Sequence, residues 1–418
     1  MLIRGSTGFD MADIFPRSLQ TVGSGLRTGW SIVGITLLLI LVGEAGLRLA
    51  LTTRDWLMGR PLTEHPITED KIARWARADA YHGATWTHDY FTELESVRPF
   101  LWQPYVYWRR PPHRGRHINV DRDGLRMTWR PPPGDGADPT PVRIFAFGGS
   151  TMWGWGARDD HTVASYLSKL LHQRGYRAQV TNYGQLGYVG TQEATALLRC
   201  IQRGEIPDIA LFYDGINEVF ASAMNDAAGI PQNEWRRRTE FNLLDRPQGL
   251  LGALGRQLPD RHLWGFGRFL AGLRRRVQPP PDNRLQAHPL RDEVVRRTLH
   301  VYTSNLAAVE SLGQPYGFEP LFYWQPNIFT KRRRSPGELA APAAEGLAVY
   351  EQAFDAIYRR VRESAALNDH PRFHDISDLF GDSEAPYYVD VTHLSEPGNR
   401  LVAEAMVEDV IALIEQRK

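Results

Sequence analysis

Val142–Thr151, with the sequence VRIFAFGGST, is the segment that decides the fold of this chain. Its first six residues are mostly β-branched or aromatic, and a short apolar run bounded by turn residues predicts a buried strand. The two glycines that follow permit a tight turn in which backbone N–H groups can face a ligand. Ser150 is therefore expected on the corner where a strand ends and the chain leads toward a helix.

Helical periodicity follows this corner. Val163, Tyr166 and Leu167 begin an apolar i, i+3, i+4 pattern that continues to Leu171, and Thr162 is a typical N-cap residue. Further short apolar runs predict strands at 178–180, 209–212 and 321–324. Strands that alternate with helices in this way indicate an α/β fold with a parallel sheet.

Two candidate partners for the serine, Asp390 and His393, lie close to the C-terminus. A serine hydroxyl needs a base within hydrogen-bond reach to remove its proton, and that base works best when a third group fixes its ring. A spacing of three residues lets a carboxylate and an imidazole converge in a short loop or a single helical turn. Each pattern alone is usually a turn or a surface ion pair, so the prediction depends on their occurring together.

A C-terminal helix is expected directly behind this histidine. Ser395 as a cap, Glu396 in the first turn and an early Pro397 form a strong helix start. His393 would then be held on a loop that precedes a packed helix.

Loops that contain Gly187 and Asn217 follow the strands at 178–180 and 209–212. The loops after parallel strands fall along the carboxyl edge of a sheet, where open α/β folds bind ligands, so both loops are expected to meet Ser150. The backbone N–H groups of Ser150 and Gly187 and the side-chain amide of Asn217 would then surround a developing oxyanion.

The four blocks resemble, in order and spacing, the motifs of the SGNH (GDSL-type) hydrolase superfamily. The resemblance covers roughly residues 142–414 outside a long insertion, and it implies a three-layer α/β/α fold of the flavodoxin-like kind. It further implies Ser150 as nucleophile, His393 as base and Asp390 as the partner of that base. Ser150, Gly187 and Asn217 would form the oxyanion hole.

Two positions depart from the commonest family pattern. The first block has Gly148-Gly149-Ser150-Thr151 where Gly-Asp-Ser-Leu is usual, and this resembles a variant found in many bacterial members. The third block has Glu218 where aspartate is commoner, which leaves the asparagine intact but leaves the finer geometry of its loop open.

Composition excludes several other classes of function. The 418 residues carry a formal net charge of +1, so nothing indicates nucleic-acid binding. Cys200 is the only cysteine and lies in a helical pattern, which favours a core position. The histidines lack metal-ligand spacing, and no dinucleotide-binding or P-loop motif follows a strand, so we expect neither a metal nor a cofactor.

The N-terminus carries a second strong pattern. After a tail of residues 1–28, an almost wholly apolar stretch at 29–51 is long enough to cross a bilayer, and we expect a single-pass inner-membrane anchor in a bacterium. A cleavable signal peptide and a buried helix are the alternatives, and the long preceding tail favours the anchor. Basic residues on both sides do not decide the orientation; long domains translocate largely regardless of charge, so the enzyme is expected outside the cytoplasm.

Residues 55–130 are expected to form a small β appendage. A hairpin is predicted around Asp121–Gly124, because the glycine permits a tight turn between two short apolar runs. The aromatic group Trp102, Tyr105, Tyr107 and Trp108 suggests either a satellite core or a surface that stacks on carbohydrate, and the core is the commoner case. Prolines and glycines at 131–136 indicate a linker to the hydrolase domain at 142–418.

An insertion at 220–297 interrupts the hydrolase pattern directly after the asparagine loop. It predicts either a lid over the carboxyl edge or a solvated helical excursion. The core is expected to resume with a helix that contains Tyr302 and Leu306, then the strand at 321–324, after which Gln325–Asn327 would line the same edge.

Together these patterns predict a membrane-tethered serine esterase that acts on an acylated small molecule or glycan. The expected bond is an acetyl ester, with a cell-envelope polysaccharide as the carrier. Three alternatives stay open: an O-acyltransferase with the same residues, a lipase or thioesterase for longer acyl chains, and a non-catalytic glycan-binding or assembly protein of the same fold.

Overall fold

The computed structural model describes the chain in two units. The first unit comprises residues 1–64 and 239–281, and the second comprises 65–238 and 282–418. The described residues are 30–31, 33–46, 69–97, 100–132, 141–232, 234, 237 and 290–417. Residues 30–31 and 33–46 are helical, whereas the rest of the predicted anchor at 29–51 lies outside the described residues. None of the described helices is both long enough and apolar enough to span a membrane.

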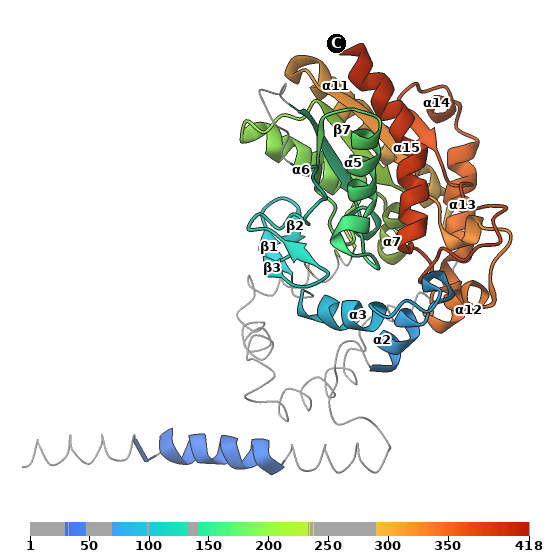
Figure 1. Ribbon diagram of the computed structural model, residues 1–418. Helices are drawn as coiled ribbons and strands as arrows, with labels where there is room; N and C mark the ends of the chain where they lie inside the picture. Colours follow the sequence, from blue (N-terminus) through green and yellow to red (C-terminus); the bar gives the residue numbers. More distant parts are fainter. Residues whose placement is uncertain are drawn as a thin grey trace, which may run out of the picture. The chain divides into compact units, whose positions relative to one another are not determined.

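A five-stranded parallel sheet forms the centre of the second unit (Figure 1). Its order is β6-β5-β7-β8-β9, so the chain starts inside the sheet, steps to one edge, and then returns past its start toward the other edge. This is the flavodoxin-like order that the family resemblance implies. The strands are β5 (Val142–Gly148), β6 (Ala178–Asn182), β7 (Ile209–Asp214), β8 (Glu319–Trp324) and β9 (Phe373–Asp375).

Helices cover the two faces of this sheet. Right-handed crossovers place the helix between β5 and β6 on one face and the helices of the returning connections on the other. Accordingly, α5 (Val163–Gln173) packs beside α15 (Glu396–Gln416). The second group packs around α11 and consists of α6 (Gly190–Gln202), α7 (Ile216–Asn225), α11 (Asp292–Tyr316) and α13 (Glu351–Arg362).

Short helices occupy the connections. At the end of β5 lies α4 (Ser150–Trp153), and the 3₁₀ helices are Asp79–Tyr81, Asp159–His161, Ile328–Thr330 and Ala348–Tyr350. The connections around β8 and β9 also hold α12 (Pro336–Ala344) and α14 (Ala365–Asn368).

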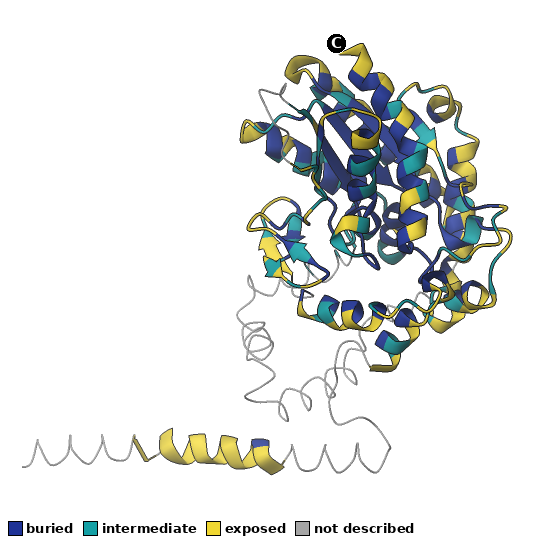
Figure 2. Cartoon of the chain, viewed as in Figure 1, coloured by how far each residue is buried: buried dark blue, intermediate teal, exposed yellow. Residues whose placement is uncertain are grey.

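Aromatic residues join the three central strands into one core. Phe147, Phe212 and Phe322 occupy matching register positions on β5, β7 and β8. Their rings stack in sequence, with centroids 5.0 and 5.2 Å apart. Each such pair contributes about 0.5–1.5 kcal/mol beyond its burial. Figure 2 shows the resulting continuous buried layer along the sheet.

The predicted elements of the hydrolase core are present. Each predicted strand is found, extended by one to two residues, and the helix expected after Thr162 is α5. The Thr162 side chain caps that helix by accepting from the backbone N–H of Ser165 at 3.2 Å. Cys200 is buried on α6, as expected for a core residue.

The expectation of a β appendage at 55–130 is wrong in part, because this segment also contains two helices. These are α2 (Glu69–Ala76) and α3 (Thr87–Ser96), and their buried residues recur at helical spacing. The β prediction rested on the hairpin pattern around Asp121–Gly124, yet Trp75, Tyr90 and Phe91 lie on helices. The β part consists of β1 (Leu101–Gln103) with β2 (Tyr107–Arg109) and β3 (His113–Arg114) with β4 (Asn119–Val120).

Two local predictions also need correction. The turn at Asp121–Gly124 forms, but Val120 and Arg126 make only an isolated bridge, because β4 pairs mainly with β3. Ser395 stands at the N-cap of α15 without a capping hydrogen bond from its side chain, since Glu396 and Pro397 already begin the helix.

The predicted linker and insertion fall largely outside the described residues. Residues 133–140 and 238–289 are not described, so the lid prediction stays a prediction. Both ends of the expected insertion at 220–297 belong to core helices, because α7 runs to Asn225 and α11 begins at Asp292.

Candidate active site

The first and third motif loops leave the sheet from adjacent strands. β5 ends just before Ser150, and its neighbour β7 ends just before α7, whose first turn carries Asn217. β6 lies on the other side of β5, so the direction in which the chain crosses the sheet reverses at β5. A reversal of this kind opens a crevice at the carboxyl edge, which is where open α/β sheets bind ligands.

Ser150, His393 and Asp390 form one hydrogen-bonded chain. Nε2 of His393 lies 2.7 Å from Oγ of Ser150. Nδ1 of the same ring lies 2.7 Å from Oδ2 of Asp390. An imidazole held in this way can take a proton from the hydroxyl while the carboxylate fixes its tautomer and orientation. Ser150 and His393 are 243 positions apart in the chain. The three side chains nevertheless meet in the arrangement that the sequence predicts.

The carboxylate is held in its ionised form by its own loop. Burial alone would raise the pKa of Asp390, but the charge of His393 and hydrogen bonds to the carboxylate lower the pKa below its usual value. Oδ1 accepts from the backbone N–H groups of Thr392 and His393, each at 2.8 Å. A local turn thus fixes the aspartate before it contacts the ring.

The amide of Asn217, one of the predicted oxyanion donors, lies beside the turn that carries Ser150. Asn217 packs so closely against Gly149 that a Cβ on that glycine would lie 1.9 Å from the Asn217 amide nitrogen. Only glycine is compatible with this approach, which places the amide beside the first turn of α4. Neither backbone N–H of Ser150 or Gly187 donates a hydrogen bond to another described residue. All three donors are therefore available to a ligand.

Gln232 contacts both Asn217 and Gly187. No pattern in the sequence predicts this role. Its Nε2 donates to Oδ1 of Asn217 at 3.2 Å, which fixes the orientation of the asparagine amide. Its Oε1 would lie 3.3 Å from a Cβ on Gly187. Glycine at this position has φ +74°, a conformation that other residues adopt only with strain.

The short helix that carries Ser150 is fixed from both sides. Asn182, fully buried at the end of β6, donates to the carbonyl of Met152 at 2.8 Å. Thr151 donates to Oε1 of Gln325 at 2.8 Å. Gln325 was expected to line the edge, and it does so by supporting the residue next to the serine.

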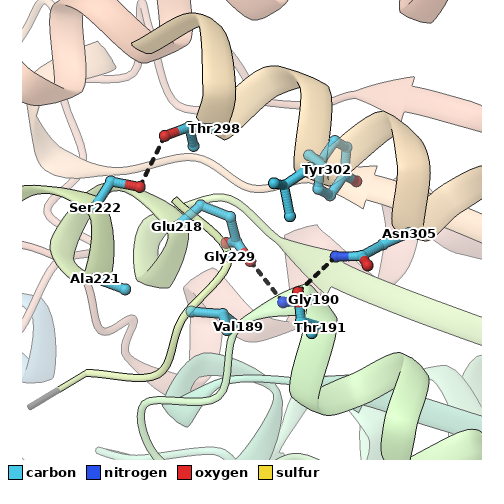
Figure 3. A pocket seen from close by; sticks show the side chains of 11 residues that line it. Val189, Gly190, Thr191, Glu218, Ala221, Ser222, Gly229, Thr298, Tyr302 and Asn305 are labelled. Atoms are coloured by element: carbon cyan, nitrogen blue, oxygen red, sulfur yellow. Dashed lines mark hydrogen bonds between the residues drawn. The ribbon is translucent and has the colours of Figure 1, made fainter. Parts of the chain in front are cut away.

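Glu218 explains the departure in the third motif. Its two carboxylate oxygens accept from the backbone N–H groups of Gly190, at 2.7 Å, and Gly215, at 2.8 Å. Figure 3 shows the bond between Glu218 and Gly190, with Tyr302 and Asn305 of α11 lining the same pocket. One side chain thus ties the loop after β6 to the loop after β7, and the longer glutamate makes both bonds.

Glu218 belongs to a buried acidic cluster with Glu193 and Asp214. Burial, followed by the charge of Glu218, raises the pKa of Asp214 to about 8. Burial also raises the pKa of Glu193 and of Glu218. Among the described residues, no three His, Cys, Asp or Glu side chains are arranged to hold a metal ion. The cluster therefore retains protons at a pH at which ordinary carboxyl groups have lost them.

Trp155 is a second residue that sequence reasoning missed. Its ring lies on the imidazole of His393, with centroids 4.2 Å apart and an interplanar angle of 31°. Trp75 and Phe91 from the N-terminal helices contact the same indole, at 4.9 and 5.2 Å between centroids. No local sequence pattern predicts this contact, because the residues lie in separate parts of the chain.

The known proteins that align with this chain do so at low identity and low TM-scores. No family model and no curated protein matches the sequence. Among solved structures, the acetyl xylan esterase AlAXEase aligns over 64% of this chain and 100% of its own, at 14% identity and a TM-score of 0.34. Axe2, an acetylxylan esterase from Geobacillus stearothermophilus, aligns over 64% and 94%, at 14% identity and a TM-score of 0.32.

A G-D-S-L family structure from Desulfitobacterium hafniense DCB-2 is also similar. It aligns over 64% of this chain and 98% of its own, at 8% identity and a TM-score of 0.32. The resemblance to the SGNH hydrolases holds in sheet order and in the meeting of the motif loops. Similarities at this level concern the fold and assign no activity or substrate to this chain.

The contact between Trp155 and His393 predicts a change in the reactivity of Ser150. Replacement Trp155→Leu removes the flat surface that fixes the imidazole, so the base is no longer aligned with the hydroxyl. We expect the rate at which a fluorophosphonate labels Ser150 to fall at least about tenfold, and Trp155→Phe to restore part of it. Labelling reactions quenched at a series of times and analysed by intact mass measure both rates.

Trp129 provides a matched control, because it also contacts a histidine, His172, at 5.7 Å between centroids. Trp129→Leu should leave the labelling rate unchanged. Equal rates for Trp155→Leu and the wild type would show that the indole does not position the imidazole.

The acidic cluster predicts a pH-dependent stability. The pKa of Asp214 is raised to about 8 in the folded chain, whereas an unfolded aspartate titrates near about 3.9. Between these values the folded state binds more protons than the unfolded state, so stability falls as the pH rises, by up to about 1.4 kcal/mol per pH unit. Urea unfolding between pH 5 and pH 9 measures this slope.

Asp214→Asn should flatten the slope, because the amide carries no titrating proton. Asp226 is a suitable control, since it is exposed and paired with Arg291, and Asp226→Asn should keep the wild-type slope. A wild-type stability that does not decline over this range would contradict the raised pKa.

Proposed function

We propose that this chain is a serine ester hydrolase of the SGNH type. The observation that carries the proposal is the hydrogen-bonded chain from Asp390 through His393 to Ser150, with 2.7 Å at each of its two steps. The Asn217 amide beside the serine turn and the unpaired N–H groups of Ser150 and Gly187 support the same chemistry, because acyl transfer develops negative charge on the carbonyl oxygen.

In the proposed reaction, Oγ of Ser150 attacks the carbonyl carbon of an ester while Nε2 of His393 takes the hydroxyl proton. The carbonyl oxygen becomes an oxyanion that accepts hydrogen bonds from the N–H groups of Ser150 and Gly187 and from the amide of Asn217. Each such donor is typically worth about 3–4 kcal/mol of transition-state stabilisation. The C–O bond to the leaving alcohol then breaks, and the alcohol takes its proton from His393.

Water resolves the acyl-enzyme by the same route. His393 takes a proton from the water as its oxygen attacks the acyl carbon, and the proton returns to Oγ of Ser150 as the carboxylic acid leaves. A sugar hydroxyl in place of water would make the same residues an O-acyltransferase. Within the proposal, the acyl group is acetyl and the carrier is a cell-envelope polysaccharide, on the strength of the family resemblance and the expected location.

The proposal predicts that Ser150 is the only nucleophile of the site. Wild-type protein should react with a fluorophosphonate probe and release acetate from acetylated glycans, whereas Ser150→Ala should do neither, with a rate loss of at least about 10⁴-fold. Gel fluorescence and an enzymatic acetate assay measure the two outcomes. Absence of label on the wild type would favour the rival function, a glycan-binding envelope protein that retains the fold.

A panel of p-nitrophenyl acetate, butyrate and longer esters extends this experiment to the acyl chain. Preference for acetate supports the proposed bond, whereas preference for long chains would indicate a lipase or thioesterase. Addition of an oligosaccharide acceptor, followed by mass spectrometry, separates transfer from hydrolysis.

A membrane tether at residues 29–51 is the second part of the proposal, with the hydrolase outside the cytoplasm. The apolar run in the sequence supports it, as does the exposure of apolar side chains along the described helix, such as Trp30 at 75% and Leu41 at 63%. An anchor of this kind holds the enzyme at the surface where envelope glycans lie.

The tether predicts that the protein resists extraction by alkaline carbonate. Full-length protein should stay in the membrane pellet, whereas deletion of residues 1–51 should release it into the supernatant, because about 20 apolar residues provide the attachment. Immunoblotting of both fractions measures this, and added protease acting on spheroplasts tests which side the hydrolase occupies. Two results would contradict an uncleaved anchor. One is a full-length chain recovered in the supernatant, and the other is an intact mass that shows cleavage after Ala45, where Gly43-Glu44-Ala45 resembles a signal-peptide cleavage site.

A further inference from the structure

The hairpin of β1 and β2 exposes a group of large aromatic side chains. Tyr105 is 73% exposed, Trp102 67% and Phe100 50%. Across residues 69–417, as far as they are described, the only other exposed aromatic side chain is Tyr316, at 43%. Single exposed apolar residues are ordinary, but three exposed aromatic side chains within six residues of one hairpin indicate a candidate binding surface. We call Phe100, Trp102 and Tyr105 the aromatic platform.

The backbone of this hairpin is strained. Tyr105 has φ +71° and Tyr107 has φ +73°, and bulky side chains rarely adopt this left-handed region. Each such residue costs on the order of 1–3 kcal/mol and persists only where its surroundings fix it, which happens mainly at functional positions. A glycine at position 105 would adopt this conformation without strain. The presence of a tyrosine instead suggests that its ring has a function.

The hairpin is anchored on the loop that carries Gly187. The indole N–H of Trp108 donates to the carbonyl of Leu186 at 2.8 Å, and the hydroxyl of Tyr188 donates to the carbonyl of Trp108. A Cβ on Gly187 would lie 3.6 Å from the Trp108 ring. Trp102 stands opposite Trp108 in the register of the hairpin, so the platform begins one strand away from an oxyanion donor.

Charged and polar groups lie against the platform residue Tyr105 and against its hairpin neighbours Tyr107 and Trp108. The guanidinium of Arg199 lies 5.1 Å from the Tyr105 ring, and that of Arg237 lies 4.3 Å from the Trp108 ring. The hydroxyl of Tyr107 donates to Glu234 at 3.4 Å. Flat apolar rings bordered by hydrogen-bonding groups match a pyranose, whose C–H face packs on the ring while its hydroxyls bind the polar border.

We propose that the aromatic platform is a sugar-binding subsite that holds a pyranose unit of an acylated glycan while its ester bond lies at Ser150. This inference rests on the proposed esterase function and names the substrate class for that site. It also gives the strained tyrosine a role, because its ring is held in place before the glycan arrives, which lowers the entropic cost of binding.

The test compares two substrates of the full-length protein in detergent. Trp102→Ala and Tyr105→Gly should each lower kcat/KM for acetylated xylooligosaccharides about three- to tenfold, and leave kcat/KM for p-nitrophenyl acetate, which has no sugar, unchanged. Tyr105→Gly should also keep or raise the Tm, because glycine relieves the strained φ. Tyr316 is an exposed aromatic residue on α11, and Tyr316→Ala is the matched control. This variant should leave kcat/KM unchanged for both substrates.

Two results would overturn the subsite. Unchanged kcat/KM for the oligosaccharides in both variants would show that the platform does not contact the sugar. An equal loss on both substrates would show that the hairpin only supports the Gly187 loop.

A binding measurement separates this proposal from the proposed function. Deacetylated xylooligosaccharides should quench the tryptophan fluorescence of the Ser150→Ala protein, and Trp102→Ala in that background should abolish the saturable part of the change. Binding without any esterase activity in the wild type would refute the hydrolase and retain the subsite. Activity on p-nitrophenyl acetate without saturable sugar binding would refute the subsite and retain the hydrolase.

Discussion

The interaction on which the site depends is the attachment of the loop after Ser150 to the N-terminal segment. The buried guanidinium of Arg126 donates to the carbonyls of Gly154 and Ala157, each at 2.6 Å, and pairs with Asp159 at 3.0 Å. Removal of one partner from such a buried charge typically costs about 3–5 kcal/mol. Because this loop carries the indole that contacts His393, the N-terminal segment fixes the base as well as its own core.

Tyrosines complete the same attachment from the N-terminal helices. The hydroxyl of Tyr81 donates to the carbonyl of Gly156 at 2.6 Å, and the hydroxyl of Tyr90 accepts from the N–H of Gly156 at 2.9 Å. Burial raises the pKa of both phenols, so they stay protonated. Gly156 has φ +88°, and these bonds hold it there. The segment expected to form a small appendage thus holds the loop that follows Ser150.

The sequence predicts the sheet and the four motif loops because both depend on local patterns. Apolar runs bounded by turns predict β5, β7 and β8, and right-handed crossovers bring Ser150 and Asn217 to one edge. The supports of the site depend instead on contacts between remote residues. Trp155 meets a ring 238 positions later in the chain, and Gln232 lies in a segment without clear periodicity. Helix α3 lies in a segment that was predicted as β structure from the hairpin pattern around Asp121–Gly124.

Two opposing constraints meet at the carboxyl edge, since the donors must stay unpaired while the loops that carry them stay fixed. An unpaired backbone N–H in a mobile loop would bind water and reorganise in the transition state, which removes most of its benefit. Glu218 resolves this for the loops after β6 and β7 by binding the N–H groups of Gly190 and Gly215, which leaves that of Gly187 available. Burial raises the pKa of Asp214 and of Glu218 beneath the site, and the bonds from Gly190 and Gly215 lower that of Glu218. The bonds that fix the two loops therefore offset part of the desolvation cost of the glutamate that makes them.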